Sequence, residues 1–320
     1  MRPALCCCTA LCVALSGAAQ AQKYPERPVR LVVALAAGGN ADLVGRLLAQ
    51  KLGERFGQQF IIDNRPGAAG TIGAEIVARA PRDGYTLLLS GSSFSIVPAL
   101  FNRLPYDPLK DLAAVTMPAN APGLLVVHPA LPVRNVKDLI TLARAKPGQL
   151  NYGSPGNSTS PHLAGALFNM MAGVDIVHVP YKGAAMAMID LVAGQIQLSF
   201  ASMPSAMAQV KPGKLRAIAV TSAQQSNAAP MLPTVAESGV PGFESGSWQG
   251  VFAPAGTPAS IVSNLSREIA RIVYLPEVTA QLAKDGSEPV GNTPEAFAQW
   301  LPGEFAKWAK VARAARMQVE

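Results

Sequence analysis

Four short segments of the chain combine glycine with residues that donate hydrogen bonds. They are 36–42, 90–93, 153–162 and 180–183, and the third, GSPGNSTSPH, is the richest. Hydroxyl groups, side-chain amides and bare backbone N–H groups suit the binding of a carboxylate or similar anion, and they have little capacity for covalent chemistry. We therefore interpret these segments as anion-binding loops.

The hydroxyl residues of 153–162 have an alternative role in capping and turning the chain. Ser160 followed by Pro161 matches the preferred order of an N-cap and a first helical residue. Capping needs one hydroxyl residue and this loop holds four, which favours binding. Lys182 in the fourth segment adds a positive charge for an anion, or is a solvated surface lysine.

Two histidines lie near these loops. His162 falls in the first turn of the helix expected after 153–162, where it can donate a hydrogen bond to an anion or make a structural one. His178 lies in an apolar β-type run between Val177 and Val179, and we interpret it as a packing residue with a satisfied hydrogen bond.

Alternating strands and helices position the four segments. Val29–Leu35 is a continuous apolar run typical of a buried strand, and a helix with apolar residues at helical spacing follows as far as Phe56. We expect Asn40 to cap this helix. The strand, loop and helix unit recurs along the chain, which predicts an α/β fold with parallel sheets. Ligands of such sheets bind at the carboxyl ends of the strands, where all four loops fall.

Two lobes are expected, because residues 22–320, which remain when an expected leader of 21 residues is set aside, exceed what one compact core usually organises. We place the first lobe at 22–121 plus 248–320 and the second at 122–247. Helices expected after Thr257-Pro258 and Thr293-Pro294 then pack on the first lobe. Pro302-Gly303 should kink or break the last of them.

The first 21 residues have the pattern of a cleavable secretory leader. Arg2 precedes an apolar run from Ala4 to Ala18, and Ala19-Gln20-Ala21 supplies the small residues of a cleavage site. All four cysteines lie in this leader, which excludes disulfide, thiolate and cysteine-metal chemistry from the mature chain. The sequence therefore predicts an exported, soluble protein in the periplasm.

The net charge and the amino-acid composition limit the classes of molecule that the protein is expected to bind. The net charge is +7, a modest positive field that steers small anions. The basic residues are scattered and only 6% of residues are aromatic, so a nucleic-acid groove with stacking platforms is not expected.

Common enzyme motifs are missing from the chain. It has no Gly-x-Ser-x-Gly elbow, no phosphate-binding lysine loop and no His-Glu-x-x-His. Gly67, Gly70 and Gly73 have the spacing G-x-x-G-x-x-G, which differs from the dinucleotide fingerprint and is better explained by a tight turn. With three histidines and scattered carboxylates, neither a metal nor another cofactor is expected.

Several longer segments resemble one family in order along nearly the whole mature chain. They are AAGGNAD (36–42), DNRPGAAGTIGAEIVARAPRDGYTLLL (63–89), LPYDPLKDL (104–112), NYGSPGNSTSPHLAG (151–165), HVPYKGAAMAMIDLVAGQI (178–196), LPTVAESGVPGFE (232–244) and WQGVFAPAGTP (248–258). The chain resembles the extracytoplasmic solute receptors of tripartite tricarboxylate transporters, the TctC or Bug family.

The resemblance implies a type II periplasmic-binding-protein-like fold. Each lobe would be a mostly parallel sheet flanked by helices, the lobes would be joined by two crossing segments, and hinge motion would close them over a small carboxylate. The binding residues that it implies are Asn40, Asp42, Ser90, Ser92, Ser93, Ser154, Asn157, Ser158, Thr159, His162, Lys182, Gly183 and, more weakly supported, Ser202. It further implies a monomer that delivers its ligand to membrane transporter subunits or reports it to a sensor kinase.

This chain departs from the family pattern beside the first loop. Ala34-Leu35 stands where members often have Pro-Phe, and Ala41 stands where a hydroxyl residue is usual. An aromatic wall and a hydroxyl donor are missing there, so the usual ligand does not carry over.

Three functions remain in competition. A receptor for a small organic acid, amino acid or aromatic carboxylate is the main hypothesis. An exported enzyme acting on such an acid would need a general base, for which Asp42 and His162 are the candidates. An interaction protein without a ligand would show no closure.

Overall fold

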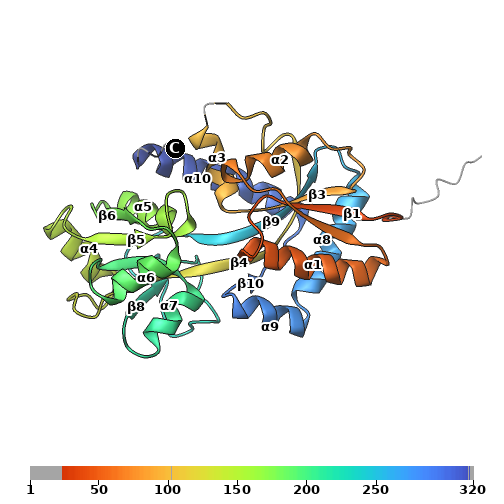
Figure 1. Ribbon diagram of the computed structural model, residues 1–320. Coiled ribbons are helices and arrows are strands. Elements are labelled where there is room, and N and C mark those ends of the chain that lie inside the picture. The colour runs from red at the N-terminus through yellow and green to blue at the C-terminus, as the bar shows by residue number, and fades with distance from the viewer. Residues whose placement is uncertain (1–23, 102, 316, 318–320) are drawn as a thin grey trace, which may run out of the picture.

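Two long strands run from one lobe into the other and belong to both halves of the molecule (Figure 1). The computed structural model describes residues 24–101, 103–315 and 317, so the expected leader lies outside the described residues. Strand β4 (Leu112–Val127) pairs antiparallel with β9 (Gly246–Pro254) as far as Pro122, opposite Gly246. From Gly123 onward it pairs with the strands of the second lobe.

The first lobe combines parallel and antiparallel pairs. Its β1 (Val29–Val33) lies parallel between β2 (Phe60–Asn64) and β3 (Thr86–Gly91), and β3 then pairs antiparallel with β9. A short β10 (Glu288–Pro289) pairs with β4. The helices of this lobe are α1 (Asn40–Phe56), α2 (Thr71–Ala78), α3 (Ser93–Leu100), α8 (Ala259–Val273) and α9 (Pro276–Lys284).

The second lobe repeats this plan on the other part of β4. Strand β5 (Asn151–Ser154) lies parallel between β6 (Val177–Pro180) and β7 (Leu198–Ser202). Both β7 and β8 (Arg216–Val220) pair antiparallel with β4. The helices are α4 (Val136–Ala145), α5 (Ser160–Ala172), α6 (Ala184–Val192) and α7 (Met203–Val210). The predicted two-lobed α/β class is confirmed, with the crossing strands adding the antiparallel pairs.

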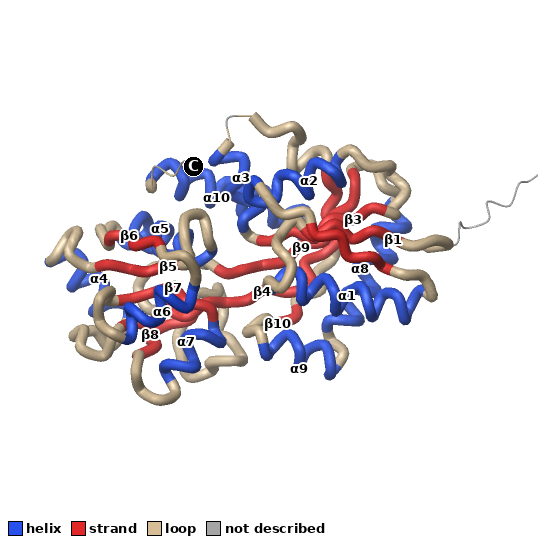
Figure 2. The backbone as a smooth tube through the Cα atoms, in the orientation of Figure 1, coloured by secondary structure: helices blue, strands red, loops and turns tan. Residues whose placement is uncertain are grey.

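Buried apolar side chains hold the helices on the sheets of both lobes, and Figure 2 shows the strands inside and the helices outside. In the first lobe, Leu48 and Leu52 of α1 join Val33 and Leu89 in one cluster. Burial of this kind stabilises a fold by roughly 25 cal/mol for each Å² of apolar surface removed from water. Because the sheets are fixed in this way, the loops at the carboxyl ends of their strands have fixed positions.

The last helix, α10 (Pro294–Ala314), contacts both lobes, which corrects the expectation that it packs on the first alone. It lies against α3 and β4, and its Trp308 is buried in the cluster that contains Phe168 of α5. It also runs through Pro302 without a break. The carbonyl of Ala298, which loses its N–H donor there, lies on the exposed side of the helix, where water can replace the donor. Among the described helices, none is both long and apolar enough to cross a membrane.

Candidate ligand-binding cleft

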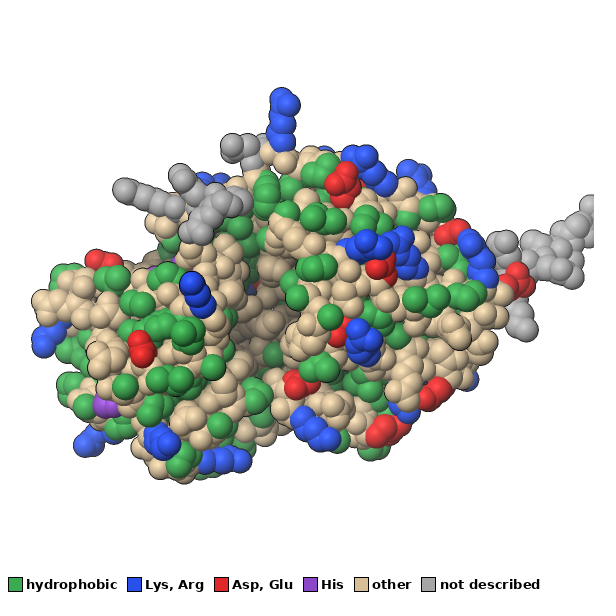
Figure 3. All heavy atoms as spheres, in the orientation of Figure 1, with side chains coloured by type: hydrophobic (Ala, Val, Ile, Leu, Met, Phe, Trp, Pro, Cys, Tyr) green, Lys and Arg blue, Asp and Glu red, His purple; other side chains and the backbone are tan. Residues whose placement is uncertain are grey.

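A cavity of about 640 Å³ lies between the lobes, and Figure 3 shows the hollow that leads into it. The first lobe contributes the start of α1 and the turn after α9, and the crossing strands contribute 121–123 and 245–247. The second lobe contributes the loop 153–162 and the starts of three helices. The volume lies within the usual range for small-molecule sites.

Helix starts from both lobes converge on this cleft. Its lining includes Asn40 at the start of α1, Ser160 at the start of α5, Ala184 at the start of α6 and Met203 at the start of α7. The first N–H groups of a helix have no partner within the helix, and the helix dipole gives that end a partial positive charge. The cleft therefore attracts an anion through fixed backbone dipoles.

The remaining lining is mostly apolar. Phe200, Met203, Pro155, Pro161 and Ala164 supply carbon surface, and Thr159, Thr221 and four serines supply hydroxyl groups. Asp285 is the one charged side chain among the described residues that line the cleft. Basic side chains are missing from that lining, so an anion in it would be held by dipoles and hydroxyl groups.

Asn40 lines the cleft but does not cap α1, and the predicted cap is wrong. The N-cap is Gly39, and Asn40 is the first helical residue. Its Nδ2 donates to Ser287 Oγ at 3.1 Å, and its Oδ1 accepts from Gln249 Nε2 at 2.5 Å. Because the carboxamide finds these partners on other elements, it ties the start of α1 to β9 and to the turn before β10.

Asp42 holds the loop of the first segment, 36–42, in place through hydrogen bonds and does not line the cleft. It is 2% exposed and accepts hydrogen bonds from Gly38 N at 2.9 Å, Arg46 Nε at 3.0 Å and Asn64 Nδ2 at 2.9 Å. Burial raises the pKa of Asp42, but these three donors and the charge of Arg46 outweigh it and hold the pKa below its ordinary value. An ion-paired carboxylate with a lowered pKa is a weak general base.

Of the serines after β3, Ser92 has the clearest role. Its Oγ lies 2.9 Å from Ser160 Oγ of α5, a hydrogen bond between the lobes. Ser90 is fully buried, its Oγ has no hydrogen-bond partner among the described atoms, and it does not line the cleft. Ser93 is the first residue of α3 and is half-buried.

Within 153–162, most hydroxyl groups hold the loop itself together. Ser154 Oγ donates to Gly156 O at 3.0 Å, and Thr159 Oγ1 donates to the same carbonyl at 2.8 Å. Ser158 has a positive φ of 58°, and its N–H donates to His162 Nδ1 at 3.0 Å. Thr159 and Ser160 line the cleft, whereas Asn157 is exposed.

His162 and His178 form a stacked pair behind this loop. Their ring centroids lie 3.9 Å apart with 12° between the planes, and His178 Nε2 lies 2.7 Å from Ser154 Oγ. Burial lowers the pKa of His162 to about 4, and burial together with the neighbouring His162 lowers the pKa of His178 to about 4. His162 is 8% exposed, does not line the cleft and accepts at Nδ1. The structure thus gives it the structural hydrogen bond that the sequence left open.

The segment 180–183 leads into α6. Gly183 is its N-cap, with a φ of 124° and a ψ of 161° that only glycine adopts readily. Lys182 is exposed and does not line the cleft. Ser202 caps α7, lines the cleft and lies 2.8 Å from Ser205 through the two hydroxyl oxygens.

Several lining residues went unnoticed in the sequence. Pro122 and Gly246 lie on the crossing strands, whose positions near 122 and 248 were expected, so that expectation was a usable signal. Phe200 lies in the middle of β7 and Asp285 follows α9, and neither lies in a glycine-rich loop.

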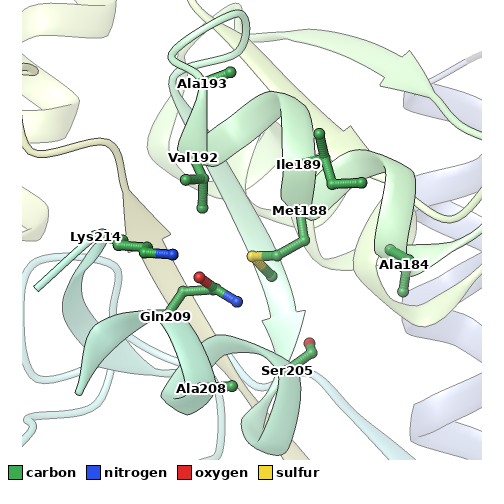
Figure 4. A pocket seen from close by; sticks show the side chains of 10 residues that line it. Ala184, Met188, Ile189, Val192, Ala193, Ser205, Ala208, Gln209 and Lys214 are labelled. Atoms are coloured by element: carbon green, nitrogen blue, oxygen red, sulfur yellow. The ribbon is translucent and has the colours of Figure 1, made fainter. Parts of the chain in front are cut away.

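A second cavity, of about 710 Å³, lies between α6 and α7 on the second lobe (Figure 4). Met188 and Val192 of α6 face Gln209 of α7 across it, Ile189 and Ala208 also line it, and Lys214 lies at one end. The cavity lies within the second lobe, and its lining comes mainly from the sides of the two helices. Of the helix starts, that of α6 lines this cavity at Ala184 and Ala185, whereas four helix starts line the interlobe cleft, which is therefore the candidate site.

The fold and the cleft together define a class of protein. Two α/β lobes on shared crossing strands, with a solute-sized cavity between them, are the architecture of a periplasmic-type solute-binding protein. The family model "Tripartite tricarboxylate transporter family receptor" matches residues 44–317. The chain belongs to this family of solute receptors, TctC.

Individual relatives agree with the family assignment. BugT of Bordetella pertussis is 35% identical over 92% of this chain and 90% of its own length. A solved structure of Rpa4515 from R. palustris with adipate is 39% identical, covers 92% of this chain and 100% of that chain, and has a TM-score of 0.74. MatC of Rhodopseudomonas palustris with bound malate is 31% identical, covers 90% and 99% of the two chains, and has a TM-score of 0.70.

Proposed function

We propose that this protein captures a small carboxylate in the interlobe cleft. The observation that carries the proposal is the convergence of the starts of α1, α5, α6 and α7 on one cavity without a basic side chain among its described lining residues. Unpaired N–H groups and helix dipoles are suited to a carboxylate, and their orientation is fixed before the ligand arrives. Adipate and malate in the two similar structures support the same ligand class.

The residues fall into a contacting group and a supporting group. We propose that Asn40, Thr159, Ser160, Ser202 and the N–H groups at the start of α6 contact the ligand. Ser92 acts on the site through its hydrogen bond to Ser160. The loops that carry the contacting groups are held by four further residues, Asp42, Ser154, Ser158 and His162.

Closure of the lobes would complete the site. Hinge motion about the crossing strands brings the start of α1 toward the starts of α5, α6 and α7, which removes the carboxylate from water and strengthens its interaction with the dipoles. We place the lobes at 22–121 plus 248–320 and at 122–247, because β4 exchanges β9 for β7 between Pro122 and Gly123. The closed form presents a new surface to membrane transporter subunits or a sensor kinase.

The proposal includes no covalent step. Of the two candidate bases, Asp42 is buried in an ion pair with Arg46, and His162 is held behind the loop. We further propose that the leader 1–21 exports the chain to the periplasm, where it acts as a monomer.

A thermal-shift panel tests this function. The purified protein is heated with organic acids, amino acids and aromatic carboxylates, and a ligand at 100 times its Kd should add about 2.7 kcal/mol to the free energy of unfolding. Native mass spectrometry of the protein as purified would identify a retained acid. A panel in which no acid raises the melting temperature contradicts the proposal.

A further inference from the structure

The charges around the cleft are distributed unevenly between the lobes. The second lobe contributes the starts of α5, α6 and α7, three partial positive charges. The first lobe contributes the start of α1 and the acidic residue Asp285, which also borders an outer groove between α1 and α9 that Arg46 and Lys51 line. A bound molecule therefore meets a positive side on the second lobe and a full negative charge on the first.

The turn that carries Asp285 is held in place at both sides of the cleft. Asp285 caps the C-terminus of α9, and Ser287, two residues further on, accepts from the side chain of Asn40 at the start of α1. Gly286 lies against the start of α7, because a Cβ built on it would lie 2.7 Å from Pro204 Cδ and 2.9 Å from Met203 Cβ. The turn thus spans from α1 of the first lobe to α7 of the second.

Asp285 has no ion-pair partner among the described residues and is half-buried. Between it and the helix starts of the second lobe lies apolar surface from Phe200, Pro122 and Ala164. A carboxylate without a partner at the edge of a largely apolar cavity repels a second carboxylate and attracts a cation, because like and opposite charges interact more strongly where water is excluded.

We infer that the cleft selects a molecule with one carboxylate and, at its other end, an ammonium group, and that Asp285 excludes dicarboxylates. The carboxylate is held by the helix starts of the second lobe, the apolar middle lies on Phe200, and the ammonium group pairs with Asp285. This inference rests on the proposed function and specifies its ligand class.

Molecules of matched length isolate the contribution of the distal group. Hexanoate, 6-aminohexanoate and adipate share a six-carbon chain and differ at one end, and butyrate, 4-aminobutyrate and succinate form a shorter series. Their dissociation constants are measured by calorimetry for the wild-type protein, D285N and D285S, with E26Q as a control. E26Q removes the same charge at an exposed position shortly before β1.

In the better-bound series, the wild-type protein should bind the amino acid at least about tenfold more tightly than the dicarboxylate. D285N and D285S should reduce that ratio to about twofold or less, and E26Q should leave it unchanged. A wild-type ratio near one, or a ratio that D285N and D285S preserve, overturns this inference and leaves carboxylate capture standing. If neither series nor any acid of the wider panel binds, the proposed function fails as well.

Discussion

Ser92 Oγ at the start of α3 and Ser160 Oγ at the start of α5 lie 2.9 Å apart and join the two lobes at the edge of the cleft. The hydrogen bond requires the lobes to approach, because its two partners belong to different sheets. Ser160 also lines the cavity. The hydroxyl group of Ser160 is therefore in position both to contact a ligand and to hold the lobes together.

Removing this bond should favour the open form. S92A and S160A should each weaken binding of the most stabilising acid by roughly twofold to tenfold, as expected for a hydrogen bond of about 0.5–1.5 kcal/mol. Because both changes remove one interaction, the double variant should lose about as much as S92A alone plus any direct contact of Ser160. Calorimetry on the cycle measures this, with S260A on the exposed side of α8 as a control. Fully additive losses would show that the two hydroxyl groups act independently.

Replacing Gly183 tests the start of α6. Nothing lies within 4 Å of a Cβ built there, so G183A acts through the backbone conformation at φ 124°, at a cost of about 1–3 kcal/mol. We expect a lower melting temperature and weaker carboxylate binding, because the first N–H groups of α6 are displaced.

Gly213 offers a matched control for that change. It has a φ of 77° and equally open space, but it lies in the turn after α7 and does not line the cleft. G213A should lower the melting temperature and leave the affinity unchanged. Equal losses of affinity in G183A and G213A would contradict a role for the start of α6.

The histidine pair should make the protein sensitive to acid. The pKa of His162 is about 4 in the folded protein because burial disfavours the imidazolium, whereas an unfolded histidine titrates near 6.5. As the pH falls below 6.5 the unfolded chain binds protons first, so the free energy of unfolding should fall between pH 6.5 and 4, by roughly 3 kcal/mol for His162.

Denaturant melts at pH 7 and pH 5 measure this loss. H162Q keeps an acceptor for Ser158 N–H and should reduce the difference between the two pH values. H128Q changes a histidine outside the pair and should leave the difference in place. Stability in H162Q that falls as steeply as in the wild-type protein would contradict this account of the pair.

The variant D42N distinguishes a structural role of Asp42 from a catalytic one. In D42N the new Nδ2 cannot accept, so either Asn64 alone or both Gly38 and Arg46 lose their acceptor, and the protein should lose about 1–3 kcal/mol of stability. D83N, which removes an exposed ion pair with Arg27, should cost less than about 1 kcal/mol. Turnover of a bound acid that disappears in D42N while binding remains would restore the enzyme hypothesis.

The parts of the fold that follow from local pattern were predictable. Helix α1 ends at Phe56 and helix α8 begins directly after Thr257-Pro258, as predicted, because hydrophobic periodicity and helix starts are encoded within a few residues. Loops at the carboxyl ends of parallel strands must share an edge, so the contribution of 153–162 to the cleft also followed.

Contacts between distant residues were not predictable in this way. Capping was the alternative role considered for Ser160, but the N-cap of α5 is Thr159, and Ser160 bonds to Ser92, 68 positions earlier in the chain and on another lobe. Asn40 bonds to Gln249 and Ser287 through packing that no local pattern shows. The same holds for Asp285, which reaches the cleft only because β10 returns to β4.

A crystal structure of the protein with its most stabilising acid tests the central claim most directly. We predict the carboxylate oxygens within about 3.1 Å of backbone nitrogens at the starts of α5, α6 or α7, with the lobes closed over the ligand. A ligand held in the groove between α6 and α7, or one whose carboxylate faces solvent away from every helix start, would contradict the account.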